Sequence, residues 1–204
     1  MLYVKFYQGV IILLLSCLCL CSCKNDMNSK LESMYSKSVT LNLNKMEQLK
    51  NNENDSIFEL YNKKNAKYDL IVFYDSLECM TCITNKMHDW NKLIQNVDSL
   101  YGSVRFLFIF SPKESDQSNI MASLRFQKFK YAAYLDRNGI LRTENNFIPE
   151  ESMYHTFLIE GDSRKIVLVG DPRRSDRLMK MFYDILDEKN KCNDGNCIEV
   201  GDKY

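Results

Sequence analysis

The chain has 204 residues, of which 45% are hydrophobic, and its 27 lysines and arginines balance its 27 aspartates and glutamates. Because neither charge gathers into a long run, the composition excludes the clustered basic surface of a nucleic-acid-binding protein. The length suits one globular domain with a substantial core, and no second domain is required.

The N-terminal region has the layout of a secretory signal peptide. Lys5 precedes an apolar run that begins at Val10, and small residues follow this run. The run is about half as long as the roughly 20 residues that a transmembrane helix needs. We therefore predict that residues 1–22 form a signal peptide that is removed after export.

Cys23 is the predicted lipid attachment site. The sequence Leu20-Cys21-Ser22-Cys23 resembles the lipobox of bacterial lipoproteins, whose cysteine is acylated and becomes the new N-terminus. Cys23 alone among the first four cysteines combines a small residue before it with a polar stretch after it. Several acyl chains would anchor the exported protein to a bacterial membrane, with its domain facing the periplasm or the cell surface. The alternative is that these cysteines are apolar fillers of the signal peptide.

The remaining chain is predicted to form a tether, one domain and a tail. Residues 23–37 are polar without an apolar period and suit a flexible tether. We expect residues 38–187 to form the domain and residues 188–204 a C-terminal tail that contains the pair Cys192 and Cys197. Since these two cysteines bracket a short turn in an exported chain, we interpret them as a structural disulfide rather than a second exchanging pair.

Strands and helices are predicted to alternate along the first part of the domain. Alternating or continuous apolar residues indicate strands, and apolar residues at steps of three and four indicate helices. The predicted elements are a strand over Val39–Leu43, a buried strand over Leu70–Tyr74, a helix from Cys79 to Val97, a buried strand over Val104–Phe110, a helix over Ser118–Phe129 and a short strand over Tyr131–Leu135.

The second part of the domain is predicted to contain a hairpin and a final helix. Thr156–Ile159 and Lys165–Val169 flank a Gly-Asp-Ser turn, and Ser175 is a suitable N-cap for the last helix. The element order predicts an α/β fold with a central, mostly parallel sheet, one antiparallel edge and helices on both faces. In the first helix we expect His88 to face solvent and Trp90 to face the core.

The pair Cys79 and Cys82 is the candidate catalytic site. It lies where a buried strand leads into the predicted helix. Free amides and the positive dipole end at a helix N-terminus stabilise a thiolate, which is the reactive form of cysteine. Two intervening residues allow the second sulfur to close a disulfide or to resolve a mixed one. Cys79 is the expected attacking thiol and Cys82 the resolving thiol.

These features resemble the thioredoxin superfamily, in particular the membrane-tethered thioredoxin-like and redoxin-domain lipoproteins of Gram-negative bacteria. The resemblance covers roughly residues 69–186 and rests on the Leu70–Tyr74 strand, the Cys79/Cys82 pair and the hairpin that begins at Thr156. It implies a thioredoxin-like fold and exchange of disulfides with thiols and disulfides of exported proteins, without a cofactor or a metal.

Three departures from the family pattern concern the tuning of this pair. Met80-Thr81 stands where many members have proline or glycine, and Tyr154 or His155 takes the place of the cis-proline that faces the cysteines in the family. Glu78 directly precedes Cys79, and its negative charge opposes thiolate formation. A less stabilised thiolate makes a weaker oxidant, which favours a reductase or an isomerase.

Several other interpretations of the cysteines stay open at this point. Cys79 and Cys82 are also compatible with a structural disulfide, or with a zinc site shared with Cys192 and Cys197. Together with His155, the first pair could mimic a copper-delivery site, although three residues usually separate such cysteines. A peroxidase of the peroxiredoxin type is disfavoured because Val72 stands where that family has proline.

The sequence therefore predicts a membrane-anchored thiol:disulfide oxidoreductase. The competing hypothesis, from a different class, is a non-catalytic lipoprotein that uses a thioredoxin-like scaffold to bind a partner.

Overall fold

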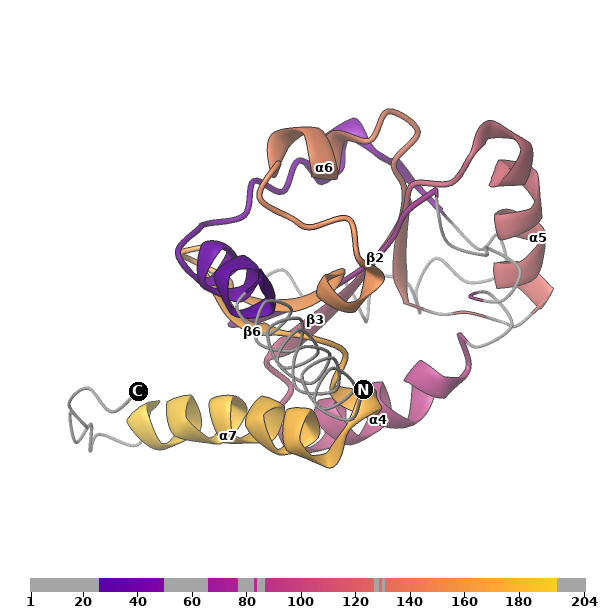
Figure 1. Ribbon diagram of the computed structural model, residues 1–204. Helices are drawn as coiled ribbons and strands as arrows, with labels where there is room; N and C mark the ends of the chain where they lie inside the picture. The colour runs from indigo at the N-terminus through magenta and orange to yellow at the C-terminus, as the bar shows by residue number, and fades with distance from the viewer. Residues whose placement is uncertain are drawn as a thin grey trace, which may run out of the picture.

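The computed structural model describes residues 26–49, 66–76, 83, 87–126, 129 and 131–193. Within these residues, six strands form one sheet in the order β1-β4-β3-β2-β5-β6 (Figure 1). The strands are β1 (Glu47–Gln48), β2 (Tyr68–Tyr74), β3 (Val104–Phe110), β4 (Ala132–Leu135), β5 (Thr156–Glu160) and β6 (Ile166–Val169).

The described helices lie on both faces of this sheet (Figure 1). They comprise a helix of residues 26–35, α4 (Asp89–Leu100), α5 (Gln117–Phe126), α6 (Ile140–Glu144) and α7 (Asp176–Asn193). Single 3₁₀ turns are η1 (Leu43–Lys45), η2 (Glu114–Asp116), η3 (Ser152–Tyr154) and η4 (Pro172–Arg174).

The strand directions confirm the predicted mixed sheet. β2, β3 and β4 are parallel neighbours, β5 runs antiparallel to β2, and β6 runs antiparallel to β5. The short β1 pairs with β4 in the antiparallel sense. The α/β fold class is therefore the predicted one, with a β5–β6 hairpin followed by the C-terminal helix α7.

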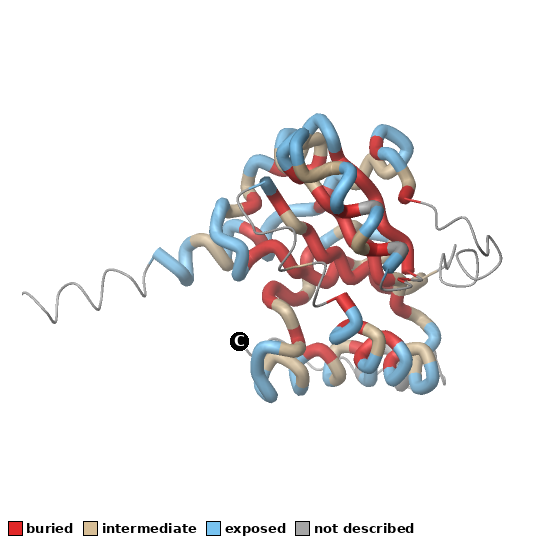
Figure 2. Tube along the Cα trace, turned by 90° about the vertical axis from the view of Figure 1, so that its right-hand side faces the viewer, coloured by how far each residue is buried: buried red, intermediate tan, exposed pale blue. Residues whose placement is uncertain are grey.

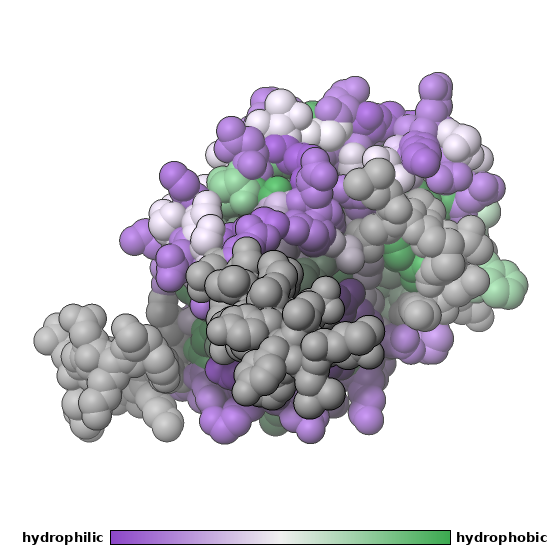
Figure 3. All heavy atoms as spheres, viewed as in Figure 1, coloured by the Kyte–Doolittle hydropathy of each residue, from purple (hydrophilic) through white to green (hydrophobic). Residues whose placement is uncertain are grey.

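Alternation along the central strands produces two apolar cores, one on each face. In β2, Leu70 and Val72 face the core that is covered by α4, α5 and α7. Ile71 and Phe73 face the opposite core, which is covered by α6 and the helix of residues 26–35. Buried residues accordingly concentrate in the middle strands (Figure 2), whereas the surface seen in Figure 3 is mainly hydrophilic.

One buried carboxylate lies in the second core near the start of β2. Asp69 is almost fully buried and accepts two hydrogen bonds from Arg105 of β3, at 2.8 Å each, and one from Arg164 at 3.0 Å. A buried carboxylate needs such partners because desolvation strongly disfavours an unpaired charge. This cluster ties the β5–β6 turn to the two central strands.

The tether prediction is wrong from residue 26 onward. Residues 26–35 form a helix whose Met34 is fully buried and whose Leu31 packs against the second core. Met27, Leu31 and Met34 follow one another at steps of four and three, which is the period of a helix with one apolar face. The abundance of polar residues around them concealed this pattern.

The strand predicted over Val39–Leu43 is also absent. Ser38 makes only an isolated bridge to Lys165, and the chain enters η1 at Leu43. The backbone of Thr40 instead pairs with the side chain of Asn145, since Thr40 N donates to Oδ1 at 2.7 Å and Nδ2 donates to Thr40 O at 2.8 Å. The Asn145 amide takes the place of a neighbouring strand.

The last helix begins as predicted and ends later. Ser175 Oγ accepts a hydrogen bond from Leu178 N at 3.2 Å, which confirms the predicted N-cap. The backbone of α7 continues to Asn193, beyond the boundary expected at residue 187. Cys192 therefore belongs to this helix, and Cys197 lies outside the described residues.

Candidate functional site

The candidate site lies at the carboxyl ends of the parallel strands. β2 ends at Tyr74 and is followed directly by Asp75, and β4 is followed in the same way by Asp136. Because β5 runs antiparallel to β2, its first residues reach the same edge, where Phe73 N donates to His155 O at 2.9 Å. Ligand and catalytic sites of open α/β sheets form at such edges.

Glu78, Cys79 and Cys82 lie outside the described residues. Ser76 is the last described residue after β2, so Cys79 follows within about 10 Å of it along the chain. In the sequence, the pair therefore follows shortly after the strand end at the edge that carries Asp75 and His155.

The predicted helix from Cys79 to Val97 is not continuous. Ile83 is helical, but Met87 and His88 form a turn, and α4 begins at Asp89. Trp90 N donates to Met87 O at 3.2 Å, a contact that belongs to a tight turn rather than to a regular α-helix. The start of α4, with its free amides, thus lies at Asp89, ten residues after Cys79 in the sequence.

A polar cluster centred on Arg142 supports this edge. Arg142 Nη2 donates to Asp75 Oδ2 at 2.7 Å, with side-chain exposures of 29% for the arginine and 9% for the aspartate. Arg142 Nη1 reaches the carbonyl oxygens of Ile148 and Pro149 at 3.3 and 3.4 Å, and the guanidinium carbon lies 5.6 Å from the centre of the Phe73 ring. Arg142 therefore links α6 and the following loop to the end of β2.

His155 belongs to the same cluster. Its ring is buried, with Nε2 3.2 Å from Arg142 Nη2 and 3.0 Å from the carbonyl oxygen of Pro149. The ring also packs against Phe73, with 5.1 Å between the ring centres. Since arginine only donates, Nε2 either accepts from Arg142 or donates to Pro149. His155 is thus built into the edge as a polar core residue.

Tyr154, the other predicted tuning residue, is buried in the second core. Burial, the largest cause, raises the pKa of its phenol above the usual value near 10. It precedes β5 in η3, where its amide donates to Glu151 O at 3.0 Å. No cis peptide bond occurs among the described residues, so the bonds around Tyr154 and His155 are trans. A tuning role for either residue stays a prediction.

A second cation lies at this edge on the opposite face of the sheet. The Arg173 guanidinium carbon lies 3.5 Å from the centre of the Trp90 ring, and Asp171 holds the guanidinium through contacts of 3.0 and 2.7 Å. Trp90 Nε1 donates to the Tyr74 hydroxyl at 3.2 Å. Trp90 is buried in the first core, as predicted.

Sequence reasoning missed Asp75, Arg142, Asp171 and Arg173. Only the position of Asp75, directly after a buried strand, offered a signal. His88 is exposed, as predicted, and its Nε2 lies 2.9 Å from Asp89 Oδ1.

The described part of the chain contains no group of three or more His, Cys, Asp or Glu side chains arranged to hold a metal ion. The zinc interpretation concerns cysteines whose side chains lie outside this part.

Comparisons with known proteins give one similar solved structure. No family model matches the chain, and no curated protein matches its sequence. The chain is similar to the solution structure of an uncharacterized thioredoxin-like protein from Porphyromonas gingivalis, with 14% identity and a TM-score of 0.45. The alignment covers 70% of this chain and 89% of that protein.

Proposed function

We propose that this protein is a membrane-anchored thiol:disulfide oxidoreductase that acts on exported proteins through Cys79 and Cys82. The observation that carries the proposal is the position of the pair in the chain. In the sequence, Cys79 comes five residues after the end of β2, and β2 ends at the carboxyl edge of the parallel strands, where buried polar groups hold the strand end in place.

The proposed reaction is a pair of thiol–disulfide exchanges. The Cys79 thiolate attacks one sulfur of a substrate disulfide, forms a mixed disulfide and releases the other substrate sulfur as a thiolate. Cys82 then attacks Cys79, which releases the reduced substrate and leaves a Cys79–Cys82 disulfide in the protein. A dithiol reductant restores the two thiols by the same chemistry. The charge of Glu78 beside Cys79 favours this reducing direction or isomerisation.

The Arg142 cluster supports the proposal by fixing the strand end that precedes the cysteines. Attack on a disulfide requires a sulfur that is held in a defined position, and groups on rigid elements give better control than groups on loops. Asp75 is four residues from Cys79 and is bound by Arg142 of α6. The fold therefore provides a rigid base for the reactive segment.

Anchoring through Cys23 belongs to the same proposal. No helix among the described residues has the length and apolar character that crossing a bilayer requires. In the proposed arrangement, acyl chains on Cys23 hold the exported domain at a membrane. Replacing Cys23 with Ser should release the protein from membranes and abolish fatty-acid labelling, whereas undiminished labelling would refute the assignment.

The alternative is a scaffold that binds a partner without catalysis. It retains the fold and treats Cys79 and Cys82 as a structural disulfide. Copper delivery gains no support from the structure, since the contacts with Arg142 and Pro149 already engage Nε2 of His155.

The oxidoreductase proposal is tested by replacing each cysteine separately, because the two cysteines act at different steps of the proposed reaction. If Cys79 attacks and Cys82 resolves, the Cys82→Ser variant should accumulate complexes with substrate that disappear on reduction. The Cys79→Ser variant should trap far fewer complexes, because the attacking sulfur is gone. A Cys192→Ser and Cys197→Ser double variant is the matched control, and it should leave the trapping by Cys82→Ser unchanged when combined with it.

A structural disulfide predicts a different pattern. Both single variants would then lose stability about equally, and neither would capture substrate. If both variants fold and both trap negligible amounts of substrate, the oxidoreductase proposal is wrong and the non-catalytic scaffold is the better explanation.

A further inference from the structure

The helix of residues 26–35 is fixed to the domain along its length. Met34 is buried in the second core, and the Tyr35 hydroxyl accepts a hydrogen bond from Val169 N of β6 at 3.2 Å. Nearer its start, Lys30 Nζ contacts Asp26 at 2.9 Å within the helix and Glu151 at 2.6 Å in the loop before η3. The chain is therefore attached to the domain almost from Asp26.

This attachment leaves little chain between the domain and the proposed lipid. Cys23 precedes Asp26 by three residues, which span at most about 10 Å when extended. A tether through residue 37 would have allowed the domain to move several tens of ångströms from the anchor. Acyl chains on Cys23 would instead hold the start of this helix next to the lipid headgroups.

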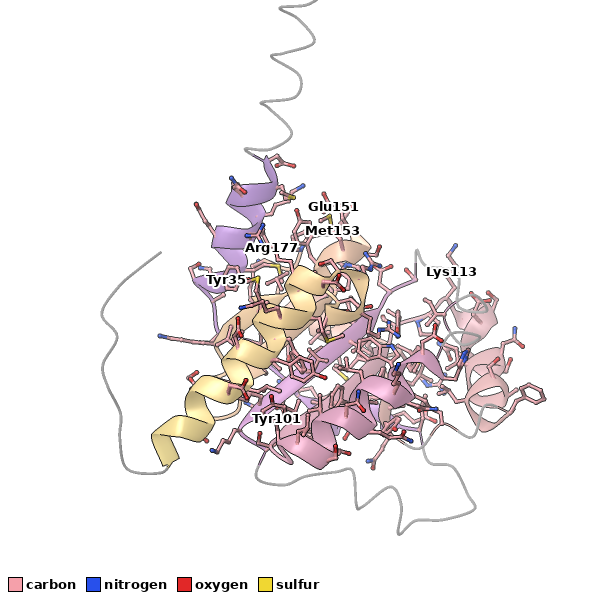
Figure 4. All side chains as sticks on the ribbon, turned by 90° about the horizontal axis from the view of Figure 1, so that it is seen from below. Tyr35, Tyr101, Lys113, Glu151, Met153 and Arg177 are labelled. Carbon is pink, nitrogen blue, oxygen red and sulfur yellow. The ribbon has the colours of Figure 1, made fainter. Side chains whose placement is uncertain are left out.

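We infer that the domain rests against the bilayer surface through the face that surrounds the start of this helix. The inference deepens the proposed function and rests on its lipid attachment at Cys23. Two methionines expose apolar side chains on this face, Met27 of the helix at 37% and Met153 of η3 at 46%. Glu151 and Met153 lie near the N-terminal end of the helix when the molecule is viewed from below (Figure 4).

The charges of this face are compatible with contact at the headgroup level. Lys30 neutralises part of the negative charge of Asp26 and Glu151, because its ammonium group lies within 3 Å of both carboxylates. The hydrogen bond that Lys30 donates to Glu151, the largest cause, also holds the pKa of Glu151 below its usual range. Exposed methionines beside paired charges suit the interface between water and acyl chains, where apolar groups enter and charges stay outside.

The orientation of the domain at the bilayer indicates which class of substrate the proposed reaction would act on. Glu151 contacts the anchored helix, and His155 of the candidate edge is four residues further along the chain, within about 14 Å. Pro149, on the other side of Glu151, contacts the His155 ring through its carbonyl oxygen. The edge of the sheet at which β2 ends, ahead of the cysteine pair in the sequence, thus lies toward the face that we place against the membrane. The expected substrates are disulfides that lie near the same bilayer surface.

Photocrosslinking to lipid tests this orientation directly. The photoreactive amino acid p-benzoylphenylalanine replaces Met27, Met153 or Phe126 in the full-length lipidated protein, which is reconstituted into vesicles that contain radiolabelled phosphatidylcholine. Phe126 ends α5, is 89% exposed and lies on a helix far from residues 26–35 (Figure 1), so it is the matched control.

We expect label on the Met27 and Met153 variants to exceed that on the Phe126 variant at least about tenfold, because a link of about 10 Å keeps one face at the lipid. Inserting a spacer of Gly and Ser residues after Asn25 should sharply reduce the labelling at Met27. Equal labelling at all three positions of a lipidated protein would overturn the orientation and leave the oxidoreductase proposal intact. Absence of lipid on Cys23 would overturn the anchor and the orientation together, without affecting the trapping test.

Discussion

Replacing Arg142 with Gln should lower the free energy of unfolding by more than the loss of an exposed ion pair does, because Arg142 supports the carboxyl edge of the sheet. The substitution removes the cation that binds Asp75 at 2.7 Å, together with the contacts to His155 and to the carbonyl oxygens of the following loop. The Asp75 carboxylate would then lose this charged partner while remaining 9% exposed. Removing the cation that pairs with a buried carboxylate is strongly destabilising, because burial prevents water from fully replacing that cation.

The expected cost follows from the burial of the pair. Breaking a fully buried pair costs about 3–5 kcal/mol, and the 29% exposure of the Arg142 side chain reduces this to about 2–4 kcal/mol. Arg137 provides the matched control, because it makes a contact of 2.7 Å with Glu47 in which both side chains are about half exposed. Arg137→Gln should therefore cost less than about 1 kcal/mol.

Urea unfolding followed by circular dichroism measures both free energies of unfolding. An unchanged dependence of this free energy on urea concentration would show that the variants unfold between equivalent folded and unfolded states. A double-mutant cycle of Arg142→Gln with Asp75→Asn isolates the pair, and we expect a coupling of at least about 1 kcal/mol. Equal losses for Arg142→Gln and Arg137→Gln, or a coupling near zero, would refute the view that this cluster holds the end of β2.

Three further predictions concern the helix of residues 26–35, alkaline pH and the cysteine pair. Met34→Ala should lower the free energy of unfolding by about 2–5 kcal/mol, whereas Met27→Ala should change it by about 0.5 kcal/mol or less. Equally small effects of both substitutions in urea unfolding would favour a flexible tether over a packed helix. Burial, and then a hydrogen bond to Asp187, raise the pKa of Tyr101 to about 12. Because the folded state keeps this proton longer than the unfolded chain, the stabilisation is complete below pH 10 and is lost as the pH approaches 12. The urea midpoint should fall across that window, and less steeply in Tyr101→Phe; identical pH profiles would contradict the assignment. If His155 stabilises the Cys79 thiolate, His155→Ala should shift the alkylation profile of Cys79 to higher pH, and an unchanged profile would leave His155 with a structural role alone.

Local apolar patterns were sufficient to predict the central fold. The continuous run over Leu70–Tyr74 and the turn between Thr156–Ile159 and Lys165–Val169 correspond to β2 and to the β5–β6 hairpin. These elements are predictable because the arrangement of their apolar residues along the chain follows directly from which side chains are buried. The helix of residues 26–35 was missed although Met27, Leu31 and Met34 have the helical period, since polar neighbours dominate its composition.

Contacts between distant residues could not be predicted in the same way. Arg142 and Asp75 are separated by 67 positions, and nothing local in either segment identifies the other as its partner. The Asn145 side chain likewise replaces the strand neighbour of Thr40 across 105 positions. Such pairs depend on the folded topology, so the supporting groups of the edge emerge only from the structure, whereas the cysteine pair is evident from its spacing.

The reduction potential of the Cys79–Cys82 pair tests the central proposal most directly. It is measured by equilibrating the exported domain with glutathione or dithiothreitol buffers and quantifying the free thiols, with Cys192 and Cys197 replaced by Ser. The oxidoreductase proposal predicts a value between about −270 and −120 mV, the range of known exchange catalysts. A value below about −300 mV, typical of structural disulfides, would contradict it.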